Sequence, residues 1–314
     1  MIKDKSGRGI DTLRISITER CNFSCLYCSN QFNKLDKKDI LSYEEIIKFV
    51  KIFSCLGIKK IKITGGEPLI RKDSISLIKE ITDISGIEDI SITTNGFYLY
   101  ENIDKVREAG IKRINISLDT LNEKKFEILT GRSCLKRIKE VIKESCKIFI
   151  PVKLNVVIMR NINLEEICDF LNFASKNNLI LKFIELMPVY KKISFWRENF
   201  VPFKNILDII KKHTYIYPIK KNGRIKSYES SEGIIIEFVT PITEPFCNKC
   251  DRVRIDCAGN LFLCLYGKPI INLKKLDGDI LNSIKFYVYN RDFSFNPFVK
   301  LKNYKLPLMN TIGG

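Results

Sequence analysis

Two kinds of hydrophobic pattern alternate along the first two thirds of the chain. Short runs rich in β-branched residues are followed by stretches whose apolar side chains recur every three to four residues, which indicates strands followed by amphipathic helices. The best-defined helix begins after Ser42, which forms a capping-box pattern with Glu45, and it ends before Gly57. The expected strands cover residues 12–18, 58–64, 89–94, 113–118, 152–159 and 180–187, and the expected helices cover about 43–56, 73–84, 100–109, 134–147, 164–177 and 203–213.

Six strand–helix repeats predict right-handed βαβ units and a parallel sheet. Residues 1–213 are too few for a complete eightfold barrel, so we expect an α/β fold with a partial (β/α)6 TIM-like barrel. Beyond residue 214 the alternation stops, and residues 215–218 and 233–239 are expected to be strands of a separate small element in a C-terminal domain, residues 214–314. Ligands of such sheets bind at the carboxyl ends of the strands.

Three cysteines stand close together directly after the first predicted strand. Cys21, Cys25 and Cys28 are spaced C-x3-C-x2-C, and Tyr27 precedes the last of them. Thiolates bind zinc or iron–sulfur clusters, but a structural zinc site takes four protein ligands, and the one histidine, His213, is far away in sequence. Three cysteines on a four-iron cluster would leave one iron open to a small ligand. A zinc knuckle or a disulfide pair is the alternative.

A second cysteine block lies near the C-terminus, where Cys247, Cys250 and Cys264 have the metal-like spacing C-x2-C-x13-C. Arg252 and Arg254 share one face of a predicted strand, and their guanidinium forks match phosphate oxygens. Cys257 could add a fourth thiolate and close the site, although it falls at the predicted tip of a hairpin. We expect the two three-cysteine sites to face each other across the mouth of the barrel.

The composition adds a preference for an anionic partner. The chain has 53 basic and 36 acidic residues and a net charge of +17, which suits a nucleotide, although the lysines are spread along helices and form no single basic block. Eleven cysteines without a signal peptide indicate a reducing compartment. No apolar run is long enough to cross a bilayer, so we expect a cytoplasmic protein without a membrane partner.

The first cysteine block resembles the signature of the radical S-adenosylmethionine (SAM) superfamily, in which an aromatic residue precedes the last cysteine. Across essentially all 314 residues the sequence is similar to one family within it, the GTP 3′,8-cyclases of molybdenum cofactor biosynthesis. The similarity rests on Leu13-Arg14, residues 64–68 (TGGEP), 93–96 (TTNG), 115–119 (NISLD), 152–155 (VKLN) and 183–187 (FIELM), the second cysteine block with Arg252 and Arg254, and the terminal Gly313-Gly314.

The resemblance implies a lyase that uses two [4Fe–4S] clusters and SAM to convert GTP into (8S)-3′,8-cyclo-7,8-dihydroguanosine 5′-triphosphate. A 5′-deoxyadenosyl radical would take hydrogen from ribose C3′, and the carbon radical would attack guanine C8. The first cysteine block would hold one cluster, and the C-terminal block would hold the second. The resemblance further implies Tyr27, Gly66, Glu67, Ser117 and Met187 for SAM, Arg14, Lys62, Thr93, Lys153, Arg252 and Arg254 for GTP, and Arg14, Arg252, Arg254, Gly313 and Gly314 as catalytic residues.

Three positions depart from the family pattern. Lys62 and Lys182 stand where arginine is usual, which keeps the charge and loses the bidentate fork, and Asp251 replaces an asparagine. The resemblance also implies a protein that converts the product into cyclic pyranopterin monophosphate, an electron donor and a homodimer, while no nucleic acid is expected. Two other classes stay open, a peptide-modifying radical maturase and a zinc-scaffolded RNA-binding protein. Iron content and a requirement for GTP separate the three.

Overall fold

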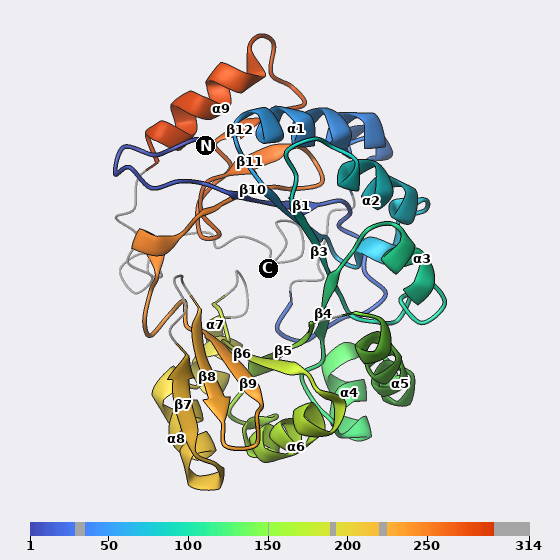
Figure 1. The fold of residues 1–314 in the computed structure, drawn as a ribbon, viewed down its shortest axis with the longest axis vertical. Coiled ribbons are helices and arrows are strands. Elements are labelled where there is room, and N and C mark those ends of the chain that lie inside the picture. The colour runs from blue at the N-terminus through green and yellow to red at the C-terminus, as the bar shows by residue number, and fades with distance from the viewer. Residues whose placement is uncertain (29–34, 150, 189–192, 220–224, 292–314) are drawn as a thin grey trace.

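The parallel sheet expected from the strand–helix repeats is present. The computed structural model describes residues 1–28, 35–149, 151–188, 193–219 and 225–291. Each of the six predicted strands pairs in parallel with the next along the chain. These strands are β1 (Thr12–Ser16), β2 (Lys60–Thr64), β3 (Asp89–Thr94), β4 (Arg113–Ser117), β5 (Val152–Ile158) and β6 (Ile180–Glu185). They curve around a central space in Figure 1, so the predicted partial barrel is confirmed.

The strands after residue 214 extend this sheet, and the expectation of a separate small element is wrong. β9 (Ile235–Val239) pairs in parallel with β6, and β10 (Arg252–Ile255) pairs in parallel with β1. The described residues therefore form a twelve-stranded sheet with eight adjacent parallel strands; the antiparallel strands at its two ends are β7 (Ile216–Ile219), β8 (Lys226–Ser230), β11 (Asn260–Phe262) and β12 (Ile271–Asn272). Because β9 and β10 are not neighbours in this order, the barrel stays open between them. The division of the chain at residue 214 stays a prediction.

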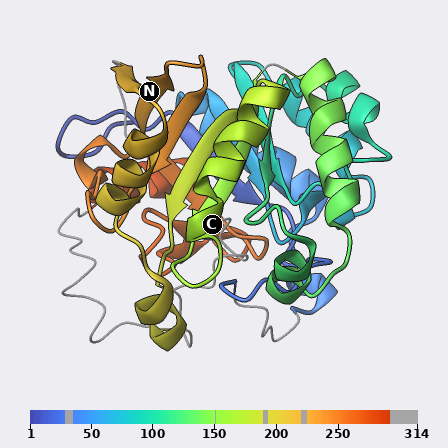
Figure 2. The ribbon, with the colours of Figure 1, turned by 90° about the horizontal axis from the view of Figure 1, so that it is seen from below.

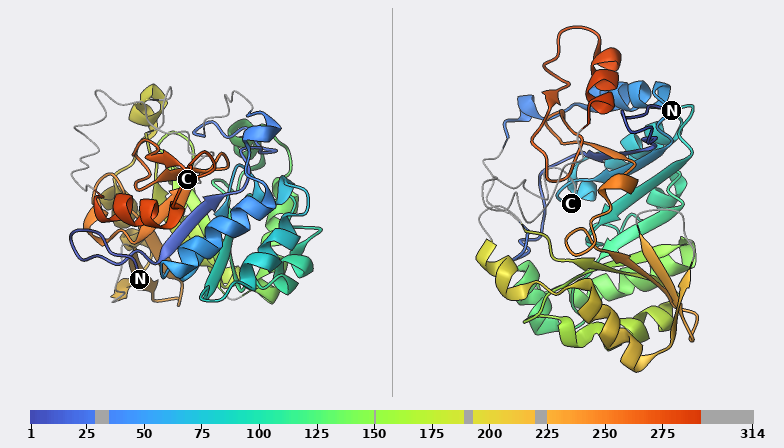
Figure 3. Two further views of the ribbon diagram at one scale, coloured as in Figure 1. Left: turned by 90° about the horizontal axis from the view of Figure 1, so that it is seen from above. Right: turned by 90° about the vertical axis from the view of Figure 1, so that its left-hand side faces the viewer.

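Helices cover the outside of the curved sheet (Figures 1 and 2). The six predicted ones are α1 (Tyr43–Cys55), α2 (Ser74–Thr82), α3 (Ile103–Glu108), α5 (Leu135–Ile148), α6 (Ile167–Asn177) and α8 (Phe203–His213). The pattern did not predict α4 (Glu123–Thr130), α7 (Ile193–Asn199) or α9 (Ile280–Tyr289). The capping box that begins α1 is confirmed, with both Ser42–Glu45 hydrogen bonds formed. α9 lies beside α1 and the amino-terminal segment (Figure 3), where the Lys5 amide donates to the Tyr289 carbonyl at 2.9 Å.

The two faces of the parallel strands have opposite character. Leu13, Ile61, Leu154 and Phe183 are fully buried in the core that includes the covering helices, and burial of each such side chain contributes about 1.5–3 kcal/mol. Successive side chains alternate between the faces of a strand, so the neighbours of these residues point into the barrel. Those inward residues are largely polar or charged, which leaves the barrel with a polar interior instead of the apolar packing of a closed barrel.

Candidate active site

One cavity of about 620 Å³ occupies the interior of the open barrel, which is large enough for a small-molecule ligand. Most of the residues predicted to form the site line it: Arg14, Cys21, Cys25, Tyr27, Cys28, Lys62, Gly66, Thr93, Ser117, Met187, Cys247, Cys250, Arg252, Arg254 and Cys264. Glu67 and Lys153 are not among the lining residues. Gly313 and Gly314 lie outside the described residues.

The first cysteine loop leaves the carboxyl end of β1 and is fixed by backbone hydrogen bonds to the end of α4. The amides of Ser24 and Leu26 donate to the carbonyls of Thr130 and Leu129 at 2.8 and 2.9 Å. Burial raises the pKa of Cys21 to about 11 and, with neighbouring negative groups, that of Cys25 well above its ordinary value. Without a metal these thiols are therefore protonated, and a bound cluster has to displace the protons.

Tyr27 on the same loop is anchored to the barrel by Asp119. Its hydroxyl donates to Asp119 Oδ2 at 2.6 Å, and Asp119 Oδ1 accepts from the amide of Val157 at 2.8 Å. Burial raises the pKa of Asp119 to about 6. The carboxylate thus ties the cysteine loop to β5, and Asp119 is a site residue that the sequence analysis did not assign.

The glycines after β2 lie against the cysteine loop. A Cβ atom on Gly66 would come within 2.3 Å of the carbonyl oxygen of Arg20, so only glycine fits there. The adjacent Glu67 is fully buried and accepts hydrogen bonds from Thr94 Oγ1 and the Asn95 amide, both at 2.7 Å, and from the Leu69 amide at 3.1 Å. Its burial raises its pKa to about 7. Through these hydrogen bonds Glu67 holds the loop after β3 in place. The predicted contact of Glu67 with SAM stays a prediction.

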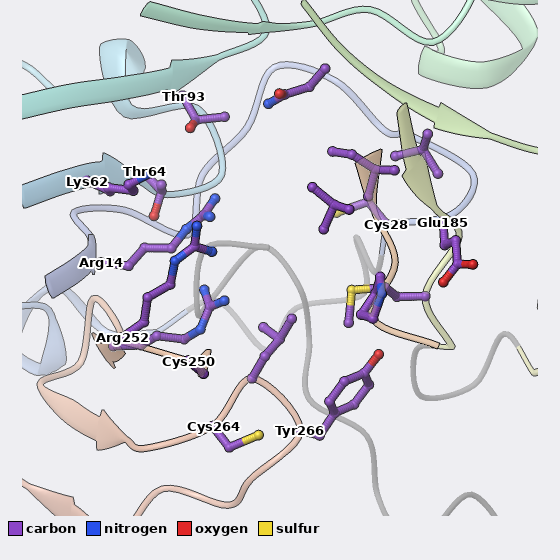
Figure 4. Close-up of a pocket in the computed structure, with 18 of the residues that line it drawn as sticks. Arg14, Cys28, Lys62, Thr64, Thr93, Glu185, Cys250, Arg252, Cys264 and Tyr266 are labelled. Carbon is purple, nitrogen blue, oxygen red and sulfur yellow. The ribbon is translucent and has the colours of Figure 1, made fainter. Parts of the chain in front are cut away.

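Cationic side chains line one wall of the cavity, where Figure 4 shows Arg14, Lys62 and Arg252 on the side of Cys250 and across from Cys28. Arg14 is paired in register with Lys62 on β2 and with Arg254 on β10, and Lys182 lines the same cavity from β6. Burial, with the nearby charges of Arg252 and Lys182, lowers the pKa of Lys62 to about 5. Burial also lowers the pKa of Lys182 to about 7, although Glu237 opposes the shift. Such a wall favours an anionic ligand that restores the charged form of the lysines.

Lys153 lies on the inward side of β5 but forms an ion pair with Glu237 on β9. Its Nζ is 2.6 Å from Glu237 Oε1, and Lys182 Nζ is 3.4 Å from Oε2 of the same carboxylate. The predicted GTP contact of Lys153 stays a prediction.

Some of the buried polar atoms at the cavity have no hydrogen-bond partner in the described structure. Among them are the Nε of Arg252, a donor, and the Oδ1 of Asn155, an acceptor. Unsatisfied buried polar groups are costly, and a polar ligand in the cavity would satisfy both. The residues present therefore fit an anionic, hydrogen-bonding ligand.

The C-terminal cysteines form a second thiol set. Burial raises the pKa of Cys247, and the nearby Cys264 and Cys250 raise it further. Cys257 is buried elsewhere, next to Asp256, Glu19 and Arg71, and does not line the cavity. In the described part of the chain, no three His, Cys, Asp or Glu side chains converge tightly enough for one metal ion. A four-iron cluster needs a wider set, because each thiolate binds a different iron.

Arg291 is a neighbour of this set that lies outside every sequence motif. It follows α9, is 3% exposed, and donates to the Sγ and the carbonyl oxygen of Cys250 at 3.3 and 3.4 Å. Burial raises the pKa of Cys250. The charge and hydrogen bond of Arg291, together with the backbone amide and charge of Arg252, have the larger combined effect, so the pKa of Cys250 is lowered. A thiolate is the form that binds a metal.

The two cysteine sets border the cavity from opposite ends of the strands, unlike the face-to-face arrangement expected at the mouth. Cys250 lies two residues before Arg252, the first residue of β10, which is in register with Thr12 at the start of β1, whereas Cys21 follows the end of β1. The carbonyl of Asp251 accepts from the amides of Asp11 and Thr12 at 3.2 Å, which fixes this position. A ligand in the cavity can therefore meet one set at each end, with the cations between them.

An open α/β barrel with three cysteines on the loop after its first strand is the architecture of a radical SAM enzyme, and the radical SAM superfamily profile matches residues 15–174. The molybdenum cofactor synthesis C profile matches residues 179–279. GTP 3′,8-cyclases from Clostridium botulinum (strain Hall) and Clostridium perfringens (strain SM101) are 37% and 38% identical, with 99% and 100% of both chains covered. The enzyme of that name from Listeria monocytogenes is 36% identical over 87% of this chain and 85% of its own. The chain belongs to the GTP 3′,8-cyclase family.

The fold is also similar to a solved structure. The crystal structure of Streptococcus suis SuiB bound to S-adenosylmethionine has a TM-score of 0.64 at 15% identity and covers 90% of this chain and 66% of SuiB. This similarity concerns the fold alone. Among the helices that the structure describes, none has the length and apolar character needed to cross a membrane.

Proposed function

We propose that the chain is a radical SAM GTP 3′,8-cyclase that forms (8S)-3′,8-cyclo-7,8-dihydroguanosine 5′-triphosphate for molybdenum cofactor biosynthesis. The observation that carries the proposal is a cavity bordered by two three-cysteine sets, with Arg14, Arg252 and Arg254 on its wall. The family membership supports the same activity. When bound, the first cluster and SAM would supply a 5′-deoxyadenosyl radical that takes hydrogen from ribose C3′. The ribose radical would then attack guanine C8, and one electron from the electron donor and one proton would complete the dihydroguanine product.

The cationic wall is the proposed triphosphate site. Arg14 and Arg254 lie side by side in register, and planar guanidinium groups bind phosphate oxygens through paired hydrogen bonds. The unsatisfied Nε of Arg252 supplies a further donor. Thr93 on β3 adds a hydroxyl to the same cavity, and Lys62 and Lys182 add charge. These contacts would orient the ribose between the two cysteine sets.

The opposite part of the cavity is the proposed SAM site. Tyr27, Gly66, Ser117 and Met187 line it next to the first cysteines. Gly66 exposes bare backbone to a ligand, and Asp119 holds Tyr27 in place. Radical transfer requires the reacting atoms to be close and shielded from water. The curved barrel wall supports the proposal because it would hold both ligands in one cavity.

We further propose that Cys247, Cys250 and Cys264 hold a second [4Fe–4S] cluster whose open iron meets the guanine. The placement of Cys257 away from the set supports a three-cysteine site. The test is the iron content of the anaerobically reconstituted chain, expected to be about eight per chain and about four in Cys250→Ser. About four irons in the unchanged chain would refute the second cluster and leave the first unaffected.

The activity is tested by incubating the reconstituted protein with SAM, a reductant and one candidate substrate at a time. We expect 5′-deoxyadenosine to form rapidly with GTP and slowly with ATP, GDP or no nucleotide. Turnover that requires a peptide instead of GTP would overturn the assignment. Colourless protein without iron would indicate a zinc-scaffolded RNA-binding protein.

Three partners belong to the proposal: a protein that converts the cyclised product into cyclic pyranopterin monophosphate, a low-potential electron donor, and a second copy of the chain. Their support is the family membership alone. Sedimentation of the reconstituted protein checks the homodimer, and a monomer at micromolar concentration would contradict it.

A further inference from the structure

We propose that Asn95 raises the reduction potential of the first cluster by donating a side-chain N–H···S hydrogen bond to Cys21. Asn95 follows β3 and lines the cavity next to the cysteine loop. The proposal depends on the radical SAM assignment of the first three cysteines and is independent of GTP as the substrate.

The contacts of the Asn95 side-chain amide point at the cysteine loop. Its Nδ2 lies 3.8 Å from Cys21 Sγ and 2.9 Å from Asn22 Oδ1. An amide nitrogen carries two hydrogens, so one group serves both acceptors. The backbone amide of Phe23 also donates to Cys21 Sγ, at 3.4 Å. Cys21 thus accepts a backbone and a side-chain hydrogen bond.

The orientation of the Asn95 amide is determined by its other end. Its Oδ1 accepts from the Phe97 amide at 3.0 Å. Rotating the amide by 180° would turn its NH2 group toward that donor and its oxygen toward Cys21 and Asn22 Oδ1, which would remove all three contacts. The hydrogen-bond network therefore assigns the nitrogen to the side of Cys21.

Glu67 explains why Asn95 is held firmly. Its carboxylate accepts from the backbone amide of Asn95 and from Thr94 Oγ1, both at 2.7 Å. The amide of Glu67 donates to the Arg20 carbonyl at 2.8 Å, one residue before Cys21. The loops after β1, β2 and β3 are thus joined in one network, with Glu67 in the middle and Asn95 against the thiol.

Hydrogen bonds to the sulfur ligands are one of the factors that set the potential of an iron–sulfur cluster. Reduction adds negative charge to the cluster and its thiolates, and a donor pointing at a thiolate stabilises that charge. Loss of the donor therefore makes the cluster harder to reduce. Asn95 is in this sense a positioning and tuning residue, and it acts on the electron transfer to SAM through Cys21.

The test is the midpoint potential of the first cluster, measured by EPR-monitored titration of the full-length reconstituted protein without GTP. Asn95→Leu has a similar size, removes the donor to Cys21 and adds no charge. We expect a lower potential in Asn95→Leu and Asn95→Ala than in the unchanged protein. The signal that shifts on addition of SAM identifies the first cluster.

Asn22→Ala is the matched control, because it removes the other acceptor of the same amide and leaves the donor to Cys21. Its potential is expected to stay close to that of the unchanged protein. An unchanged potential in Asn95→Ala at full iron content would overturn the proposal, and so would an equal fall in Asn22→Ala.

A second measurement needs no Asn95 variant to fold. In protein labelled with ¹⁵N at the asparagine side chains, pulsed EPR of the reduced first cluster is expected to show a weak ¹⁵N coupling that Asn22→Ala retains. Absence of that coupling would refute the hydrogen bond. Because neither measurement uses GTP, failure of this inference and failure of the proposed function are distinguishable.

Discussion

Binding of GTP at pH 8 should draw protons from solution onto two lysines of the cavity wall. In the free protein burial lowers the pKa of Lys62 to about 5 and that of Lys182 to about 7. Both lysines are therefore mostly neutral at pH 8, Lys182 about one-tenth protonated and Lys62 much less. A triphosphate favours the charged ammonium form, so the pKa of each lysine rises when the nucleotide binds.

The expected uptake is about two protons per GTP at pH 8 if both lysines become charged. Each proton taken up weakens binding about tenfold for every unit by which the pH rises, or about 1.4 kcal/mol. The affinity for GTP is highest when the pH is below the pKa of the lysine in the free protein. It falls as the pH rises from that value toward the pKa of the lysine in the GTP-bound protein. Between pH 7 and 9 the dissociation constant should therefore increase steeply.

Isothermal titration calorimetry in buffers of different ionisation enthalpy counts these protons directly. Lys182→Met should reduce the uptake by about one proton, the share of that lysine. Lys59→Met is the control, since Lys59 is exposed and Glu88 raises its pKa, and it should leave the uptake unchanged. A proton count of zero in the unchanged protein, or the same count in Lys182→Met, would show that these lysines are not in the phosphate site.

Further predictions concern affinity, iron binding and stability. Arg252→Met should weaken GTP binding about 10- to 100-fold, because a hydrogen bond to a charged group contributes about 1.5–3 kcal/mol, whereas Arg137→Met on the outer surface should not change the dissociation constant measured by calorimetry. Gly66→Ala should lower the iron content, because the added Cβ would come within 2.3 Å of the backbone of the cysteine loop. Gly267→Ala is the control and should retain full iron, because a Cβ on Gly267 meets nothing closer than 3.4 Å. Glu185→Ala should lower the free energy of unfolding by about 3 kcal/mol in urea titrations, since it leaves buried amides that bonded to the carboxylate unpaired; a loss below 0.5 kcal/mol would contradict that role.

Sequence periodicity predicted the barrel because its information is local. Each strand from β1 to β6 is followed by a helix of its own, and a parallel connection of that length leaves one topology. The places of β9 and β10 could not be derived in the same way. Leu13 on β1 pairs with Val253 on β10, although most of the chain separates the two residues in sequence. No local sequence pattern near either residue predicts that pairing. The strands after residue 214 were therefore wrongly assigned to a separate element.

The candidate site was predictable where residue spacing carries chemistry. The cysteine blocks and the paired Arg252 and Arg254 all line the cavity. Spacing does not say which way a carboxylate or a distant arginine points. The sequence did not predict that the Glu67 carboxylate binds the loop after β3. It also did not predict the contact between Arg291 and Cys250, because that contact depends on the packing of α9 beside the amino terminus.

The central claim is that the cavity places the ribose of GTP against the carbon radical derived from SAM. The most direct test uses GTP carrying deuterium at C3′ in a single-turnover reaction, followed by mass spectrometry of the 5′-deoxyadenosine. We predict one deuterium in that product and formation of the cyclised nucleotide in equal amount. Unlabelled 5′-deoxyadenosine beside cyclised product would contradict the claim.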